Sequence, residues 1–116
     1  MDPDCLFCRI VANQIPATVV HETKTTLAFR DIAPKAPVHV LVIPKDHHPD
    51  VTSLARADPS VAADVLAAAA AVAEAEGVLA DGFRLIFNNG AWAGQEVFHV
   101  HAHVLGGRPL GPMVST

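Results

Sequence analysis

Three histidines at two-residue spacing, His99, His101 and His103, are the residues of this chain best suited to chemistry. They lie in an otherwise apolar run, residues 98–105, and such alternation is typical of a half-buried strand. All three imidazoles then share one face, and the opposite face is formed by Phe98, Val100, Ala102 and Val104. Same-face neighbours on a strand are about 6–7 Å apart, so one metal ion could not easily hold all three rings. We therefore expect the three rings to have different roles.

The middle ring, His101, is the candidate nucleophile. A neutral imidazole is both a nucleophile and a proton carrier, and water can later hydrolyse its phosphorus adduct. The loop before it offers two glycines that permit close backbone approach, Gly90 and Gly94, and neutral amides that suit phosphate oxygens, Asn88 and Gln95. It is not a Walker loop, and no nearby carboxylate cluster indicates magnesium. The pattern predicts phosphoryl chemistry without a divalent cation.

Two other interpretations of the triad stay open at this point. The segment could be a polar-faced edge strand whose solvated rings do no chemistry. Alternatively, His99 and His101 could be ligands of a hydrolytic zinc ion.

The chain has two cysteines, Cys5 and Cys8, in a Cys-x-x-Cys pattern. A thioredoxin-type redox motif should follow a strand and open a long helix, and the position of Cys5 so close to the start disfavours that interpretation. A zinc site would need two further ligands, and unligated thiols are the remaining possibility.

Length and composition indicate one globular domain. Of the 116 residues, 51% are hydrophobic and 17% are charged, and the net charge is −4 with scattered basic residues. Nucleic acid and anionic membrane are therefore not expected as partners. The first residues lack the pattern of a signal peptide, and the alanine-rich stretch 61–72 is too short to span a bilayer, so we expect a cytoplasmic protein.

The pattern of the chain predicts an α+β fold. A short helix is expected over residues 5–12, a hairpin over 19–30, a buried strand over 39–43, and two further strands over 83–88 and 97–105. Asp58 followed by Pro59 is a strong helix start, and the apolar periodicity after it ends at Gly77. We expect a five-stranded antiparallel sheet with one long and one short helix.

The segment from His99 to Leu105 resembles the His-φ-His-φ-His-φ-φ signature of the histidine triad superfamily, where φ is an apolar residue. Residues 106–113 are similar to the ending of its bacterial Hint branch, and further blocks match in order at residues 5–11, 15–17, 29–39 and 42–45. The resemblance implies a single domain over residues 5–109, followed by a C-terminal tail over 110–116.

The resemblance also implies roles for the histidines. His101 would attack the α-phosphorus of a nucleoside phosphoramidate and form a nucleotidyl-histidine that water hydrolyses. His103 would form a hydrogen bond with the reacting phosphoryl group and help the leaving amine depart. The backbone carbonyl of His99 would hold the His101 ring in its productive tautomer. Gln95 and Asn88 match the phosphate-side contacts of the family.

The nucleoside end of the expected site is formed by apolar residues and one carboxylate. Asp31 matches the residue that accepts from both ribose hydroxyls, although the residues alone allow an Asx turn ahead of Pro34. The base slot implied by the resemblance consists of residues that would otherwise be assigned to the core: Phe7, Ile10, Phe29, Ile32 and Leu41.

The zinc ligands implied by the resemblance are Cys5, Cys8, His47 and His99, and His48 or His39 could substitute for His47. The expected zinc is structural, and no catalytic metal or organic cofactor is expected. Glu96 departs from the family, since animal members have a serine there that contacts phosphate, and the tail lacks the tryptophan that ends those members.

We expect a homodimer that hydrolyses purine nucleoside phosphoramidates, such as adenosine 5′-monophosphoramidate or aminoacyl adenylates, to the nucleoside monophosphate. The alternatives are a dinucleoside polyphosphate hydrolase of the same superfamily and a purine-nucleotide binding or scaffolding module with incidental hydrolysis.

Overall fold

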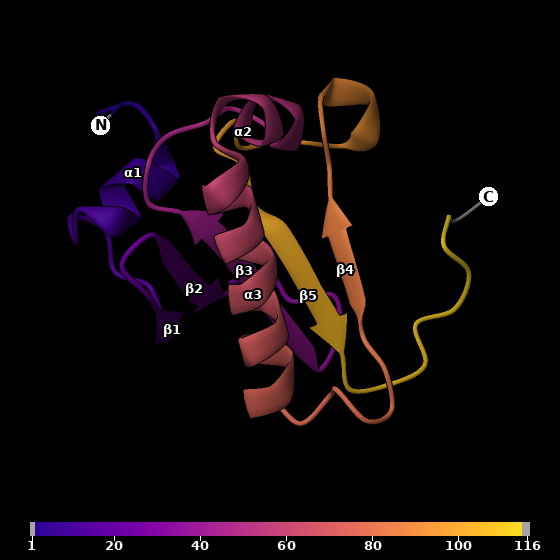
Figure 1. The fold of residues 1–116 in the computed structure, drawn as a ribbon. Coiled ribbons are helices and arrows are strands. Elements are labelled where there is room, and N and C mark those ends of the chain that lie inside the picture. The colour runs from indigo at the N-terminus through magenta and orange to yellow at the C-terminus, as the bar shows by residue number, and fades with distance from the viewer. Residues whose placement is uncertain (1, 115–116) are drawn as a thin grey trace.

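A computed structural model describes residues 2–114 of the chain. Its five strands form one antiparallel sheet in the order β1-β2-β3-β5-β4. Figure 1 shows α3 lying across one face of this sheet, with β4 and β1 at its two edges. The elements are α1 (Leu6–Val11), β1 (Val19–Glu22), β2 (Thr26–Arg30), β3 (Val38–Pro44), α2 (Val51–Ala57), α3 (Pro59–Ala75), β4 (Arg84–Phe87), the 3-10 helix η1 (Ala91–Ala93) and β5 (Ala102–Gly106).

The predicted α+β class and the five-stranded antiparallel sheet are confirmed. The long helix begins at Pro59, as predicted, because the carboxylate of Asp58 accepts a hydrogen bond from the amide of Val61 at 3.2 Å. It ends before Gly77, which has a positive φ of 75°. No helix in the described part of the chain is long and apolar enough to cross a bilayer.

The structure adds a helix that the sequence analysis left unassigned. Helix α2 has 7 residues, and the carboxylate of Asp50 caps it by accepting from the amide of Ser53 at 2.8 Å. Its first turn contains Val51 and Thr52, whose β-branched side chains weaken the helical pattern. Asn89 holds this turn from outside, since its side-chain oxygen accepts from the amide and the hydroxyl of Thr52.

The predicted strand over residues 97–105 is wrong in its extent. Strand β5 begins only at Ala102, so that His99 and His101 precede the sheet. The amide of Val100 donates to the carbonyl of His48 at 2.8 Å rather than to a neighbouring strand, which turns this segment towards the loop after β3. The expected alternation of faces holds from Val100 onward, but Phe98 is 49% exposed and lies outside the core.

The two faces of the sheet bury different clusters. The face under α3 carries the larger core, which includes Val42, Val65 and Val104. The other face carries a smaller cluster in which α1 packs on β2 and β3. On this face, one row of paired residues runs across four strands, namely Phe29, Leu41, His103 and Ile86. The third histidine of the triad thereby lies beside apolar side chains on the open face.

Candidate active site

The ring of His101 is held with its reactive nitrogen free. Its Nδ1 lies 2.8 Å from the backbone carbonyl of His99, and a carbonyl can only accept, so Nδ1 carries the proton and donates it. In the neutral ring the lone pair is therefore on Nε2. His101 is 9% exposed, and the ring of Phe7 packs against it edge-on at 5.1 Å between centroids. This arrangement presents an immobilised imidazole lone pair at the wall of a pocket.

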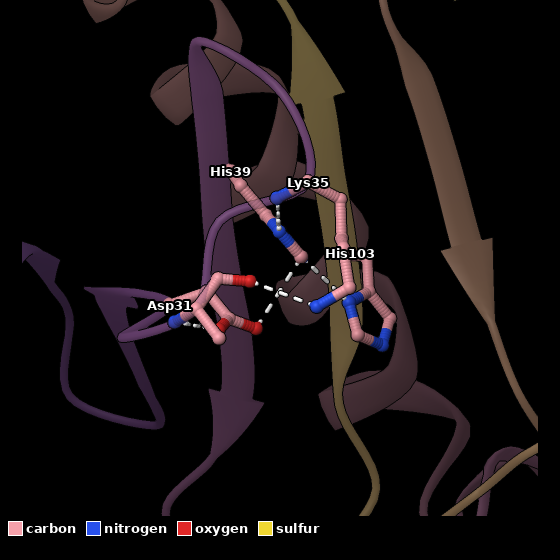
Figure 2. A network of polar contacts seen from close by, with 5 residues as sticks. Asp31, Lys35, His39 and His103 are labelled. Carbon is pink, nitrogen blue, oxygen red and sulfur yellow. Dashed lines mark hydrogen bonds and ion pairs between the residues drawn. The ribbon is translucent and has the colours of Figure 1, made fainter.

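His103 belongs to a second network, which Figure 2 shows from close by. Its Nδ1 lies 2.9 Å from Nε2 of His39, and Nδ1 of His39 accepts from the amide of Lys35 at 3.1 Å. A carboxylate oxygen of Asp31 lies 3.5 Å from Nε2 of His39. Burial lowers the pKa of His39 and lowers the pKa of His103 to about 4, so both rings are neutral near pH 7.

Except for Gln95, the residues predicted for the nucleotide line one pocket, together with His101 and His103. Asp31 and Asn88 also line it, and five apolar residues form its wall: Phe7, Ile10, Phe29, Ile32 and Leu41. Phe7, Phe29 and Leu41 are buried, whereas Ile32 is fully exposed at the rim. Asp31 also forms the alternative Asx turn, because its Oδ1 accepts from the amide of Ala33 at 2.8 Å.

Gln95 is placed differently from the other predicted phosphate contacts. It is 5% exposed and is not among the residues that line the pocket. Its amide nitrogen donates to the carbonyls of Pro49 at 2.7 Å and Val97 at 3.1 Å, and its oxygen accepts from the amide of Gly90 at 2.8 Å. The side chain is therefore engaged inside the loop, and its observed role is to shape the loop that precedes His99.

The residue that departs from the family, Glu96, lies at the edge of the site. Glu96 is exposed and lines the pocket beside His101 and His103. Trp92, in η1, is fully exposed and is not a lining residue.

A separate cluster gathers the side chains that the sequence analysis assigned to zinc: Cys5, Cys8, His47 and His99. The ligand atoms of these residues all lie within 4.8 Å of one another. Nδ1 of His99 is 3.4 Å from the sulfur of Cys5 and 3.5 Å from that of Cys8, and Nδ1 of His47 is 3.4 Å from the sulfur of Cys8. A tetrahedral zinc with bonds of about 2.3 Å to sulfur and about 2.0–2.1 Å to nitrogen separates these atoms by about 3.6 Å. The spacing fits such an ion.

The tautomer of His99 also fits a metal. Its Nε2 lies 2.8 Å from the carbonyl of Pro44, so Nε2 donates a proton and the lone pair of Nδ1 faces the two sulfurs. Burial lowers the pKa of His99 to about 4, which keeps the ring neutral. Burial raises the pKa of the Cys5 thiol, so a free Cys5 would be a poor redox nucleophile. Neither alternative ligand belongs to this cluster: His48 is outside it, and His39 lies beside His103.

The cluster of Cys5, Cys8, His47 and His99 and the two rings of the pocket, His101 and His103, are joined through one residue. The side chain of His99 faces the cysteines, while its backbone carbonyl fixes the tautomer of His101. Helix α1 contributes to both places as well, because it lies against the cluster through Cys8 and lines the pocket through Phe7 and Ile10. The cluster therefore lies behind the pocket wall.

His39 is the site residue that the sequence analysis missed as a partner of the triad. The sequence signal that could have identified it is the alternation of side chains between the two faces of β3, the strand that contains His39. His39 and Leu41 share a face of β3, and Leu41 pairs with His103 across the sheet. A histidine two residues from that pair lies diagonally opposite His103, within reach of a ring.

The fold and the site together define a histidine triad protein, and the chain belongs to the HIT family, whose domain model matches residues 12–110. It is 42% identical over 115 residues to a protein of Escherichia coli K12 called purine nucleoside phosphoramidase, covering 99% of this chain and 97% of the relative. A 14 kDa zinc-binding protein of Zea mays is 43% identical over 94% of this chain and 86% of its own length. A HIT family hydrolase from Clostridium thermocellum has a TM-score of 0.94 at 42% identity, covering 99% and 100% of the two chains.

Proposed function

We propose that the protein is a purine nucleoside phosphoramidase, which hydrolyses the P–N bond of a nucleoside phosphoramidate to a nucleoside monophosphate and an amine. The observation that supports this most directly is the pairing of two imidazole rings in one pocket, those of His101 and of the neutral His103. His101 offers a lone pair on Nε2, and His103 faces it with ring centroids 5.0 Å apart. The name of the Escherichia coli relative supports the same activity.

In the proposed reaction, Nε2 of His101 attacks phosphorus while the P–N bond to the amine breaks. The amine takes up a proton from the solution as it leaves, and the nucleotide stays attached to His101. Water then attacks phosphorus, the bond to His101 breaks, and the water returns a proton to the solution. His103 donates a hydrogen bond to the phosphoryl group and stabilises the charge that develops on its oxygens. The carbonyl of His99 keeps the proton of His101 on Nδ1.

The proposed binding mode places the purine against the apolar wall of the pocket and the ribose beside Asp31. One carboxylate oxygen of Asp31 belongs to the Asx turn, and the other is near His39. A carboxylate has enough acceptor sites to bind the ribose hydroxyls in addition to these contacts. Asn88 provides a neutral amide to the phosphate, whereas Gln95 acts by holding the loop.

We propose that the cluster of Cys5, Cys8, His47 and His99 holds structural zinc. Sites with four protein ligands leave no open position for substrate, and zinc supplies folding energy there rather than catalysis. The spacing of the sulfurs and nitrogens and the tautomer of His99 support this assignment.

We propose further that the single domain spans residues 5–109 with residues 110–116 as a tail, that it is a homodimer, and that it acts in the cytoplasm. β4 is an edge strand of the sheet, and Leu66 of α3 is 51% exposed, so a second copy could cover both. The two unbridged cysteines suit a reducing compartment. Light scattering on the purified protein tests the dimer.

The first test is the hydrolysis of a fluorogenic adenosine phosphoramidate at saturating concentration, with His21→Ala as the matched control for His101→Ala. His21 lies on the edge strand β1, away from the pocket. We expect the His101 variant to lose at least about 10³-fold in kcat while it still binds AMP, because only the covalent step is removed. We also expect kcat to survive chelation. Retained turnover in His101→Ala would exclude the nucleophile, and turnover of diadenosine polyphosphate alone would favour the polyphosphate hydrolase.

A further inference from the structure

Side chains alternate between the two faces of the sheet along β4 and beyond its end. Ile86 lines the pocket, and Phe87 packs against the core under α3 on the other face. Phe87 is the last residue of β4 and pairs with Ala102, so Asn88 lies beyond the paired part of the strand. Asn88 again lines the pocket, whereas the side chain of Asn89 contacts α2. The position of Asn88 therefore depends on what holds the residue after it.

Helix α2 holds Asn89 with two hydrogen bonds to one atom. Oδ1 of Asn89 accepts from the hydroxyl of Thr52 at 2.6 Å and from the amide of Thr52 at 3.0 Å. Two donors from one residue fix this oxygen in direction as well as in distance. The helix is itself anchored, because Leu54 is buried in the core and the carboxylate of Asp50 caps the first turn. Thr52 is therefore a rigid support for the chain at Asn89.

The other end of the loop after β4 is attached to the same segment of chain. The side chain of Gln95 donates to the carbonyl of Pro49 and accepts from the amide of Gly90. The backbone amide of Gln95 also donates to the carbonyl of Gly90, at 3.1 Å, so residues 90–95 form a closed loop. Figure 1 shows α2 beside this loop. Residues 49–52 thus hold the loop at both ends.

We propose that Thr52 and Asn89 are positioning residues, which hold Asn88 with its amide directed to the phosphate of the substrate. The inference rests on the proposed function, because that function assigns the phosphate contact to Asn88. Neither Thr52 nor Asn89 is among the residues that line the pocket, so they act through Asn88 and do not touch the substrate. A displacement of about 1 Å in a group that contacts the reacting atoms can cost about 10²-fold in rate. Helix α2 thereby has a role at the site.

The first test compares the affinities of the wild type and of three variants for AMP and for adenosine, which has no phosphate. Asn89→Ala removes the acceptor from an exposed side chain, Thr52→Val keeps the shape of threonine without its hydroxyl, and Thr52→Ser keeps the hydroxyl. We expect the Kd for AMP to rise about tenfold in Asn89→Ala and about threefold in Thr52→Val, because a hydrogen bond to a charged group is weakened. It should stay at the wild-type value in Thr52→Ser.

The Kd for adenosine separates positioning of Asn88 from support of the fold. It should change less than about twofold in all three variants, since the nucleoside end of the pocket is formed by other elements. Equal changes for AMP and adenosine would mean that the contact between Thr52 and Asn89 only stabilises the protein, and would overturn the proposal.

A double variant shows whether the contact acts through Asn88. Asn88→Ala and Asn89→Ala should each lower kcat/KM for the phosphoramidate about tenfold. In the double variant, Asn89→Ala should cost less than about a further twofold, because the side chain that it positions is already absent. Two losses that multiply would overturn the proposal.

A measurement of backbone order keeps the test independent of the enzymatic activity. In 15N relaxation, a rigid backbone amide has an order parameter of about 0.85 and a flexible one lies below about 0.6. We expect the amide of Asn88 to be rigid in the wild type and in Thr52→Ser and to fall towards the flexible range in Asn89→Ala. The amide of Ile86, which lies within β4, should stay rigid in every variant.

An Asn88 amide that stays rigid in Asn89→Ala would overturn the inference. If no phosphoramidate were hydrolysed at all, the proposed function would fail. The order parameters and the Kd values for AMP and adenosine would then still decide whether Thr52 and Asn89 position Asn88 for a phosphate.

Discussion

Removal of the metal is expected to release helix α1 while the sheet stays folded. The helix has 6 residues, too few to be stable alone, and ordering their backbone costs about 6–12 kcal/mol. Burial of Phe7 offsets about 1.5–3 kcal/mol of this cost. The edge-on contacts of its ring with Phe29, His99 and His101 add about 0.5–1.5 kcal/mol each. The remaining deficit of a few kcal/mol is smaller than the roughly 10–16 kcal/mol that structural zinc supplies.

The release of α1 should change both the hydrogen exchange of the helix and the affinity of the pocket for AMP. In hydrogen exchange followed by mass spectrometry, the amides of α1 should lose protection after chelation and in Cys8→Ser, and zinc should restore it only in the wild type. Amides of α3 serve as the internal control, because the core under that helix does not include the cluster. Since Leu6, Phe7 and Ile10 line the pocket, we expect the Kd for AMP to rise about tenfold or more.

Two outcomes would refute this reasoning. Protection of α1 that persists after verified removal of the metal would mean that side-chain packing alone docks the helix. Simultaneous loss of protection in α3 would mean that the metal supports the whole fold rather than the pocket wall.

Three further predictions concern the pH dependence of stability, the hydrogen bonds of Gln95 and the binding of Co²⁺. The folded pKa of His103 is about 4 against about 6.5 in the unfolded chain, so the unfolded state takes up the proton first and stability falls as pH decreases from about 6.5 towards 4. Between pH 7 and 5, His103 should account for about 1 kcal/mol of the fall in the free energy of unfolding, since partial solvation of the ring reduces the effect. Denaturant titrations of the wild type and of His103→Gln measure this difference. Gln95→Glu should lower the free energy of unfolding by about 1–3 kcal/mol, because a carboxylate oxygen would face the carbonyls of Pro49 and Val97, and an unchanged value would contradict the loop role. Co²⁺ should bind with one equivalent per chain and show thiolate charge-transfer absorption, whereas a bound Co²⁺ without that absorption would contradict the assignment of the metal to Cys5 and Cys8.

The fold could be predicted well where the pattern is long and regular. The start of α3 at Pro59 and the exclusive use of antiparallel pairs follow from capping, periodicity and short connections. The apolar slot for the base could be predicted only through the resemblance, because from the sequence alone Phe29 and Leu41 would be assigned to the core. The structure places them on the face opposite α3, where they line a pocket.

Other features depend on contacts between distant segments that a local pattern does not contain. The departure of His99 from the predicted strand depends on a backbone hydrogen bond from Val100 to His48, which lie 52 residues apart along the chain. The position of the Gln95 side chain depends on its hydrogen bond to the carbonyl of Pro49, which follows His48 in the loop after β3. Both contacts join the segment before β5 to the segment after β3, so the order of the strands had to be known first.

Residues 2–114 contain two clusters in which a histidine ring meets a backbone group, and that backbone group decides what the ring can do. At His99 the neighbouring backbone group is the carbonyl of Pro44, which accepts the proton of Nε2 and leaves the Nδ1 lone pair facing two sulfurs. At His39 it is the amide of Lys35, which occupies the Nδ1 lone pair and leaves a proton on Nε2 facing His103. An acceptor thus prepares one ring to ligate a metal, and a donor prepares the other to pass a hydrogen bond onward. Residue types alone could not separate these roles, because the distinction lies in which backbone group each ring meets.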